Sequence, residues 1–324
     1  MLTPLGWAAQ RFELGPRALR WGTTAALVVA VLVVLGGGVV RVTGSGLGCP
    51  TWPACEGTSI APVTPSVRAV IEFGNRLVTV LLIAAVAWAI IAARLQRPRD
   101  RMLTRLAWSQ FWLVVANALA GGVTVLARLN PWLVALHFVL AIGLLTTATL
   151  TWHRARTLLR SEESHHAAAP RAPGRVRALA WATTGATLLL ILIGTLVTGA
   201  GPHSGDSAAV TRMPFDWTVV VRVHGILGGA VIAMAVALWV LLARTGPRLA
   251  ARRAVGLVAV LLAQGGIGLY QALDGLPEVA VALHVLGSAL VWIGMLRVLL
   301  DTDSRLFAVH ERGPRMRSAL PANA

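Results

Sequence analysis

The chain has 324 residues and a formal net charge of +16; 56% of its residues are hydrophobic and only 13% are charged. A soluble domain of this length could not bury so much apolar surface, so the composition excludes an ordinary soluble protein and indicates an integral membrane protein. The positive charge alone would suggest nucleic-acid binding, but the placement of the arginines excludes that class as well.

Apolar stretches long enough to cross a bilayer recur along the chain. A transmembrane helix needs about 20 such residues at a rise of about 1.5 Å each. The first stretch follows a short basic segment and has no small-residue cleavage site at its end, so we expect a retained helix and not a signal peptide. We predict an all-α integral membrane fold with eight transmembrane helices, at 22–41, 69–93, 104–127, 132–152, 176–198, 218–243, 252–271 and 279–299.

The arginines lie mostly on one side of these predicted helices. All 29 basic residues are arginines, and 23 of them lie in the N-terminal segment, in the connections after even-numbered helices, or in the C-terminal tail. The remaining six are Arg41, Arg68, Arg76, Arg128, Arg212 and Arg222. By the positive-inside rule, both termini are expected in the cytoplasm of a cell-membrane protein, and nucleic acid is not an expected partner.

Two halves of the chain resemble each other. "LGGGVVRVTGSG" at 35–46 resembles "IGTLVTGAGPHSG" at 193–205, and "AGGVTVLARLNPWLVALHFVLA" at 120–141 resembles 264–288, with a short insertion in the second copy. Four helices per copy give both copies one orientation, so we predict two four-helix bundles related by a pseudo-twofold axis along the membrane normal. The expected organisation is an N-terminal segment 1–21, a first bundle 22–152, a flexible cytoplasmic linker 153–175, a second bundle 176–299 and a tail 300–324.

The repeat brings four polar side chains to one depth in the membrane. It pairs Asn75 with His224 and His137 with His284, and each lies five or six residues inside an even-numbered helix, roughly 8–9 Å below the outer boundary. The other histidines lie elsewhere, in cytoplasmic segments or an external loop: His153, His165, His166, His203 and His310.

The second half carries a candidate cofactor site at this depth. A single histidine within the membrane is often a hydrogen-bonded packing residue, but two at matched depth favour a function. Neutral imidazoles suit iron, and two histidines on facing helices are a usual arrangement for haem in electron transfer. We therefore predict His224 and His284 as axial haem ligands; zinc is disfavoured because no Cys or carboxylate joins them.

The first half differs because Asn75 replaces one imidazole, which leaves a coordination position beside His137 free or weakly occupied. Glu72 lies three residues before Asn75 on the same helical face and could transfer a proton near an open metal. A salt bridge between Glu72 and Arg76, at i,i+4 spacing, explains the same residue equally well.

The only two cysteines, Cys49 and Cys55, lie in the first external loop, where a disulfide can persist. They are either a structural link or a redox-active pair, because a loop this short gains little stability from closure.

Together these residues carry a family resemblance. "GGGVVRVTGSGLGCPTWPAC" at 36–55, "EFGNR" at 72–76, "VTGAGPHSGD" at 197–206 and the histidines at 137, 224 and 284 resemble haem A synthases, over nearly the whole chain. The resemblance implies an eight-helix membrane enzyme that oxidises a methyl group of haem O to the formyl group of haem A, which cytochrome oxidase needs.

The resemblance also implies roles for individual residues. His224 and His284 would hold a haem b, Glu72 would be essential near the haem O substrate, and Cys49 and Cys55 would form a disulfide connected with haem handling. Catalysis would then involve Glu72, Asn75 and His137, with His137 on the substrate iron. Implied partners are haem O synthase, cytochrome oxidase assembly factors, an external thiol-disulfide partner and the lipid bilayer. Arg41 and Arg76, at the outer boundary, are candidates for the substrate propionates, with ordinary snorkelling as the alternative.

Two features depart from the family pattern: its usual motif is E-F-x-H-R where this chain has Asn75, and the second external loop lacks a cysteine pair found in some members. Two other functions are compatible with the pattern. One is a non-catalytic b-type electron carrier with one or two haems; a carrier with a haem in each half would have two similar bis-histidine sites, which the asparagine disfavours. A transporter would have helices broken near the midplane, whereas the polar residues here lie near the outer edge.

Overall fold

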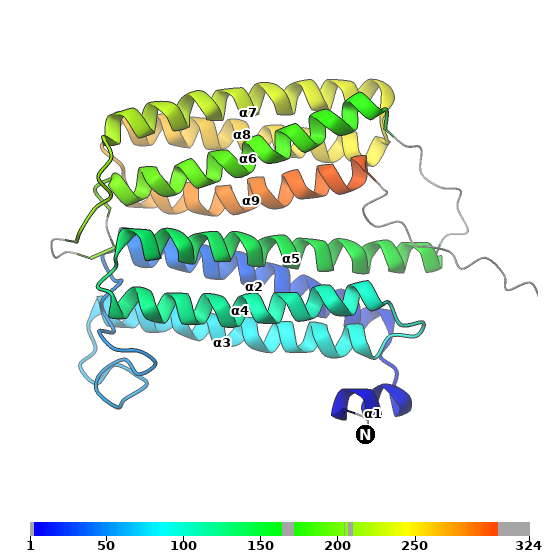
Figure 1. Cartoon of the computed structure of the whole chain (residues 1–324), viewed down its shortest axis with the longest axis horizontal. Helices are drawn as coiled ribbons and strands as arrows, with labels where there is room; N and C mark the ends of the chain where they lie inside the picture. Colours follow the sequence, from blue (N-terminus) through cyan, green and yellow to red (C-terminus); the bar gives the residue numbers. More distant parts are fainter. Residues whose placement is uncertain (1–2, 164–171, 204, 207–209, 304–324) are drawn as a thin grey trace, which may run out of the picture.

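The structure is a computed structural model that describes residues 3–163, 172–203, 205–206 and 210–303. The described residues form helices joined by loops (Figure 1). The helices are α1 (Pro4–Arg11), α2 (Pro16–Val42), α3 (Val67–Arg94), α4 (Arg101–Leu126), α5 (Pro131–Glu163), α6 (Gly174–Ala200), α7 (Trp217–Thr245), α8 (Arg248–Leu273) and α9 (Glu278–Thr302).

Eight of these helices, α2 to α9, are long and apolar enough to cross a membrane, which confirms the predicted all-α membrane fold. Their ends differ from the predicted spans because hydropathy marks only the apolar part of a helix. α5 continues to Glu163, so the first part of the predicted 153–175 linker is helical, and residues 164–171 of that linker lie outside the described residues. The short helix α1, whose N-terminus is capped by Thr3, was not predicted. His165, His166 and the tail from residue 304, with His310, also lie outside the described residues.

The long helices form two groups of four that lie side by side, α2–α5 and α6–α9 (Figure 1). Within each group every helix contacts the next, and the last contacts the first. The groups meet where α9 contacts α2 and α5, and where α5 contacts α6. The α2–α9 and α5–α6 contacts exchange under a twofold rotation, and the α5–α9 contact maps onto itself, as a pseudo-twofold axis requires.

The repeat has a stricter register than the sequence comparison suggested. α4 and α8 have equal length and begin 147 residues apart, and α5 begins 147 residues before α9. The turns after α4 and α8 also match. The N–H of Leu129 donates to the carbonyl of Thr124, and the N–H of Leu276 donates to the carbonyl of Gln271. Leu129 and Leu276 both have positive φ. The predicted insertion in the second copy is therefore wrong: the sequence alignment matched two glycine doublets that are not structurally equivalent.

The packed hydrophobic core of each half stops before the loops that join the helices at the end opposite α1. Beyond it, most side chains of both halves are partly buried or exposed, with a few buried ones such as Ala69, Glu72 and Val125. The core residues nearest that end are Val34, Leu82, Val114 and Ala141 in the first half, and Val231, Leu261 and Val291 in the second. In both halves the buried apolar cluster thus ends before the loop end of the bundle.

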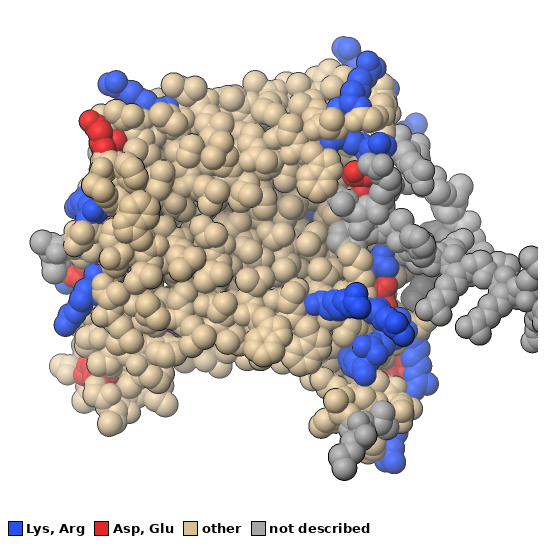
Figure 2. Space-filling model, in the orientation of Figure 1, with Lys and Arg blue, Asp and Glu red and all other residues tan. Residues whose placement is uncertain are grey.

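Arginines gather at the opposite end, which carries α1 and the α3–α4 connection (Figure 2). At the loop end the two halves are joined directly: Gly46 N–H donates to the Gly205 carbonyl at 2.7 Å, and Arg41 donates to the carbonyl of Thr198 on α6. Near the axis, Trp292 of α9 donates to Thr146 of α5 at 2.8 Å. These contacts join the two halves both at the loop end and between the middle parts of α5 and α9.

Candidate functional site

The four side chains predicted to share one depth each face a glycine on the preceding helix. A Cβ atom added at that glycine would lie 3.1 Å from Cε1 of His137, 3.2 Å from Cε1 of His224 and 3.6 Å from Cε1 of His284, and it would overlap Oδ1 of Asn75. The glycines are Gly121, Gly194, Gly268 and Gly36, respectively. The repeated geometry supports the pairing of Asn75 with His224 and of His137 with His284.

Each of the four side chains carries a buried polar atom without a well-formed hydrogen bond, although the rings of His137 and His224 lie beside backbone groups of Asn117 and Leu190. These atoms are Oδ1 of Asn75 and Nδ1 of His137, His224 and His284. A buried polar atom without a partner costs free energy, and such atoms are uncommon in native structures. All four lie toward the loop end of their helices, an arrangement that is compatible with a polar or metal-containing group between them.

In the second half, the rings of His224 and His284 face each other with centroids 6.3 Å apart and planes inclined at 67°. Two imidazoles on opposite sides of one metal, with bonds of about 2 Å, would have ring centres roughly 6 Å apart. The described residues contain no group of three His, Cys, Asp or Glu side chains able to hold a bare metal ion. A pair of imidazoles at this spacing fits haem iron, whose other ligands come from the porphyrin.

In the first half, Glu72 is buried and both of its carboxylate oxygens have partners. Oε2 accepts from the N–H of Cys49 at 2.6 Å, and Oε1 accepts from Nη2 of Arg76 at 2.6 Å. The structure thus contains the i,i+4 salt bridge that the sequence allowed, and it adds a hydrogen bond to the loop between α2 and α3 that spacing could not reveal.

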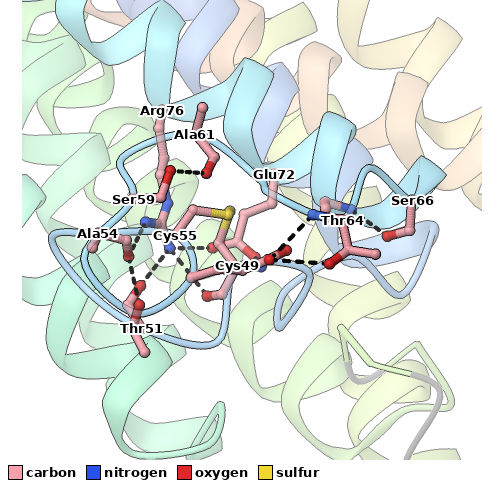
Figure 3. The surroundings of a disulfide bond; sticks show 12 residues. Cys49, Thr51, Ala54, Cys55, Ser59, Ala61, Thr64, Ser66, Glu72 and Arg76 are labelled. Atoms are coloured by element: carbon pink, nitrogen blue, oxygen red, sulfur yellow. Dashed lines mark hydrogen bonds and ion pairs between the residues drawn. A yellow bond between two sulfur atoms is a disulfide. The ribbon is translucent and has the colours of Figure 1, made fainter.

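Arg76 binds the same loop at several points (Figure 3). Its Nη2 donates to the carbonyls of Cys49 and Thr51, and its Nη1 donates to those of Pro53 and Ala54, at 3.1–3.4 Å. All four carbonyls belong to the stretch between Cys49 and Cys55. These two cysteines form a disulfide, which confirms their predicted pairing. A single guanidinium therefore holds the disulfide loop against α3.

The disulfide loop also packs on the first half through Trp52. A Cβ atom added at Gly122 of α4 would overlap the Trp52 ring, so the indole lies directly on the helix backbone. Gly122 follows Gly121, the glycine that faces His137. The loop consequently covers the end of the first half beside His137, Asn75 and Glu72.

The two arginines predicted as candidates for the substrate propionates differ in which of their guanidinium N–H groups have a partner. The Nη groups of Arg76 are engaged by the loop and by Glu72. Arg41 donates through Nη2 to Thr198, whereas its Nε is buried without a described partner. Of the other predicted polar residues outside this zone, His203 pairs with the carbonyl of Leu276 and His153 lies buried far from the loops.

This combination of a paired-imidazole half and a half with a disulfide loop over Glu72 can be compared with known proteins. Residues 20–296 match the profile of COX15-CtaA, described as cytochrome oxidase assembly protein. The chain belongs to this family.

Individual COX15-CtaA relatives are similar over part of their length. A Heme A synthase of Symbiobacterium thermophilum is 34% identical over 205 residues, which are 61% of this chain and 63% of the relative. Heme A synthases of Exiguobacterium sibiricum and Lysinibacillus sphaericus are 32% and 36% identical over 177 and 124 residues, covering 53% and 38% of this chain and 56% and 40% of the relatives. The chain thus aligns with less than two thirds of each relative.

Sequence reasoning missed three parts of the site: the glycines that face the polar side chains, the clamp of Arg76 on the loop, and Trp52. The glycines had a signal, because the interval from Gly121 to His137 equals that from Gly268 to His284. The Arg76 contacts had none, since their partners lie 22–27 residues away in an irregular loop.

We expect Arg76→Gln to expose the disulfide loop. The substitution removes several hydrogen bonds and leaves the Glu72 carboxylate without its ion-pair partner, so the rate of Cys49–Cys55 reduction by a soluble thiol should rise by about tenfold or more. Arg222→Gln, which removes an arginine from the second half, should leave the rate unchanged. Gel-shift detection of alkylated thiols measures both rates, and equal rates in Arg76→Gln and the unmodified protein would contradict the clamp.

Proposed function

We propose that this protein is a haem A synthase, which converts a methyl group of haem O to a formyl group. The observation that carries the proposal is a difference between the two halves. In the second half the ring centroids of His224 and His284 are 6.3 Å apart. In the first half Asn75 occupies the place of His224. The similarity of this COX15-CtaA chain to proteins named Heme A synthase supports the same conclusion.

The second half is proposed to hold a resident haem b through His224 and His284. Their spacing and their unpartnered Nδ1 atoms suit this role, and Gly194 and Gly268 let the rings lie close to the neighbouring helices. A haem b with two imidazole ligands would supply one-electron transfer to the other half.

The first half is proposed to bind haem O. His137 would ligate the substrate iron, and Asn75 on the facing helix would leave the other side weakly ligated. The unpartnered Nε makes Arg41 the better candidate for a substrate propionate, because a guanidinium pairs strongly with a carboxylate. Arg76 would act mainly through the loop, by holding it over the end of the site.

Glu72 is proposed to handle protons. Oxidation of a methyl group to a formyl group releases protons and electrons and takes up one oxygen atom, so a base is needed beside the reacting carbon. Arg76 and the N–H of Cys49 fix the carboxylate of Glu72 in place and stabilise its charge. The same contacts connect the proposed base directly to the disulfide loop.

We place the protein in the cell membrane, with the Cys49–Cys55 loop outside and the arginine-rich end in the cytoplasm. The uneven distribution of arginines supports this orientation. Haem O synthase, cytochrome oxidase assembly factors and an external thiol-disulfide partner are proposed as its partners.

The proposal predicts that membranes containing the protein and a source of haem O accumulate a formyl haem. Glu72→Gln should lower its formation by about 100-fold or more, because the proposed base is lost. Glu56→Gln changes an exposed carboxylate in the same external loop and should have no effect. Haem extraction followed by mass spectrometry identifies the product; a haem O pool that is never converted would contradict the enzyme and favour an electron carrier.

The ligand assignment has its own test in the purified protein. His224→Ala and His284→Ala should each lower bound haem b by more than about tenfold, because each removes an axial ligand. His203→Ala, in the external loop, should retain it. The pyridine haemochrome spectrum reports the haem content, and an unchanged content in either ligand variant would show that the resident haem is held elsewhere.

A further inference from the structure

At the arginine-rich end, a pocket of about 960 Å³ lies between α1 and the first turns of α4. Its walls include four arginines from the end of α3, the α3–α4 connection and α4, and two tryptophans of α4. These residues are Arg94, Arg99, Arg101, Arg105, Trp108 and Trp112.

The positive charge in this pocket is not balanced by the protein. None of the four arginines forms an ion pair with a described residue, and no acidic side chain lines the pocket. The nearby carboxylates are engaged elsewhere: Asp100 pairs with Arg154 at 2.6 Å and caps α4, and Glu13 lies 4.0 Å from Arg97. Four guanidinium groups that line one pocket favour an anion with several acceptor oxygens, such as a phosphate.

The tryptophans indicate what carries that phosphate. Trp108 and Trp112 lie one and two turns deeper than Arg105 and are 38% and 63% exposed. Exposed tryptophans mark the boundary between head groups and hydrocarbon. The same face of α4 continues with exposed Leu119 and Val123, which would contact acyl chains. A free anion would gain nothing from this apolar continuation, whereas a phospholipid uses both parts.

The internal repeat separates this feature from the general need for arginine at a membrane boundary. At the repeat distance of 147 residues, Arg248 and Arg252 of α8 match Arg101 and Arg105, so both halves have the charged pair. The tryptophans are replaced by Val255 and Ala259 in the second half. The wall formed by α1 belongs to the first half alone among the described helices.

We propose that this pocket binds the phosphate-bearing head group of an anionic phospholipid, with the acyl chains lying along Trp108 and Trp112 of α4. The site lies at the opposite end of the helices from the proposed haem ligands, and it does not depend on the proposed enzymatic function.

The test compares matched double variants of the full-length protein in detergent. Native mass spectrometry with added phosphatidylglycerol should show binding about tenfold or more above that of phosphatidylcholine. Arg101→Gln with Arg105→Gln should reduce binding to the phosphatidylcholine level, whereas Arg248→Gln with Arg252→Gln should leave it unchanged. Equal loss in both double variants, or no preference for phosphatidylglycerol in the unmodified protein, would overturn the proposal.

Two further measurements distinguish a lipid from a free anion. A large excess of inorganic phosphate should leave most of the phosphatidylglycerol bound, and Trp108→Ala with Trp112→Ala should weaken lipid binding severalfold. Complete displacement by phosphate, or lipid binding unaffected by loss of both tryptophans, would show a simple anion site and overturn the lipid assignment. The melting temperature of every variant confirms that it is folded.

Discussion

The structure depends on one constraint: polar side chains held in an apolar membrane zone need partners. Asn75, His137, His224 and His284 lie six to eight residues inside their helices at the loop end, each against a glycine, and each has a buried polar atom without a well-formed hydrogen bond. The hydrophobic cores of both halves stop short of this depth. Under the proposed function, a haem bound in each half would provide partners for these side chains.

Duplication also explains how one fold can carry two roles. The second half has two imidazoles at a separation that suits a single iron, so its haem would be saturated and stable. The first half has the same backbone geometry, including Gly36 in the place of Gly194, but an amide in the place of His224. It also has the Glu72–Arg76 pair and the disulfide loop, so the half proposed to ligate iron more weakly also holds the carboxylate proposed to transfer protons.

The sequence predicted the eight membrane helices because their apolar runs are long, and it predicted the shared depth of four side chains because the repeat counts residues from the same membrane surface. It could not predict α1, which is too short and polar to register as a span. The continuation of α5 past the apolar run was missed for a similar reason. The contacts of Arg76 depend on how an irregular loop folds back onto α3, and no periodic pattern encodes that path. The sequence comparison misaligned the two halves at their glycine doublets. Glycines recur in that part of both helices, so more than one alignment matches them.

Under the proposed function, the first half would leave an iron coordination position free where the second half would fill it with imidazole. Electron paramagnetic resonance of protein loaded with haem in both halves tests this, with total haem measured in the same sample. The unmodified protein should show one bis-imidazole low-spin haem, and Asn75→His should show two, because Gly36 leaves the room for an imidazole that Gly194 leaves for His224. Two bis-imidazole haems in the unmodified protein, or only one in fully loaded Asn75→His, would contradict the account.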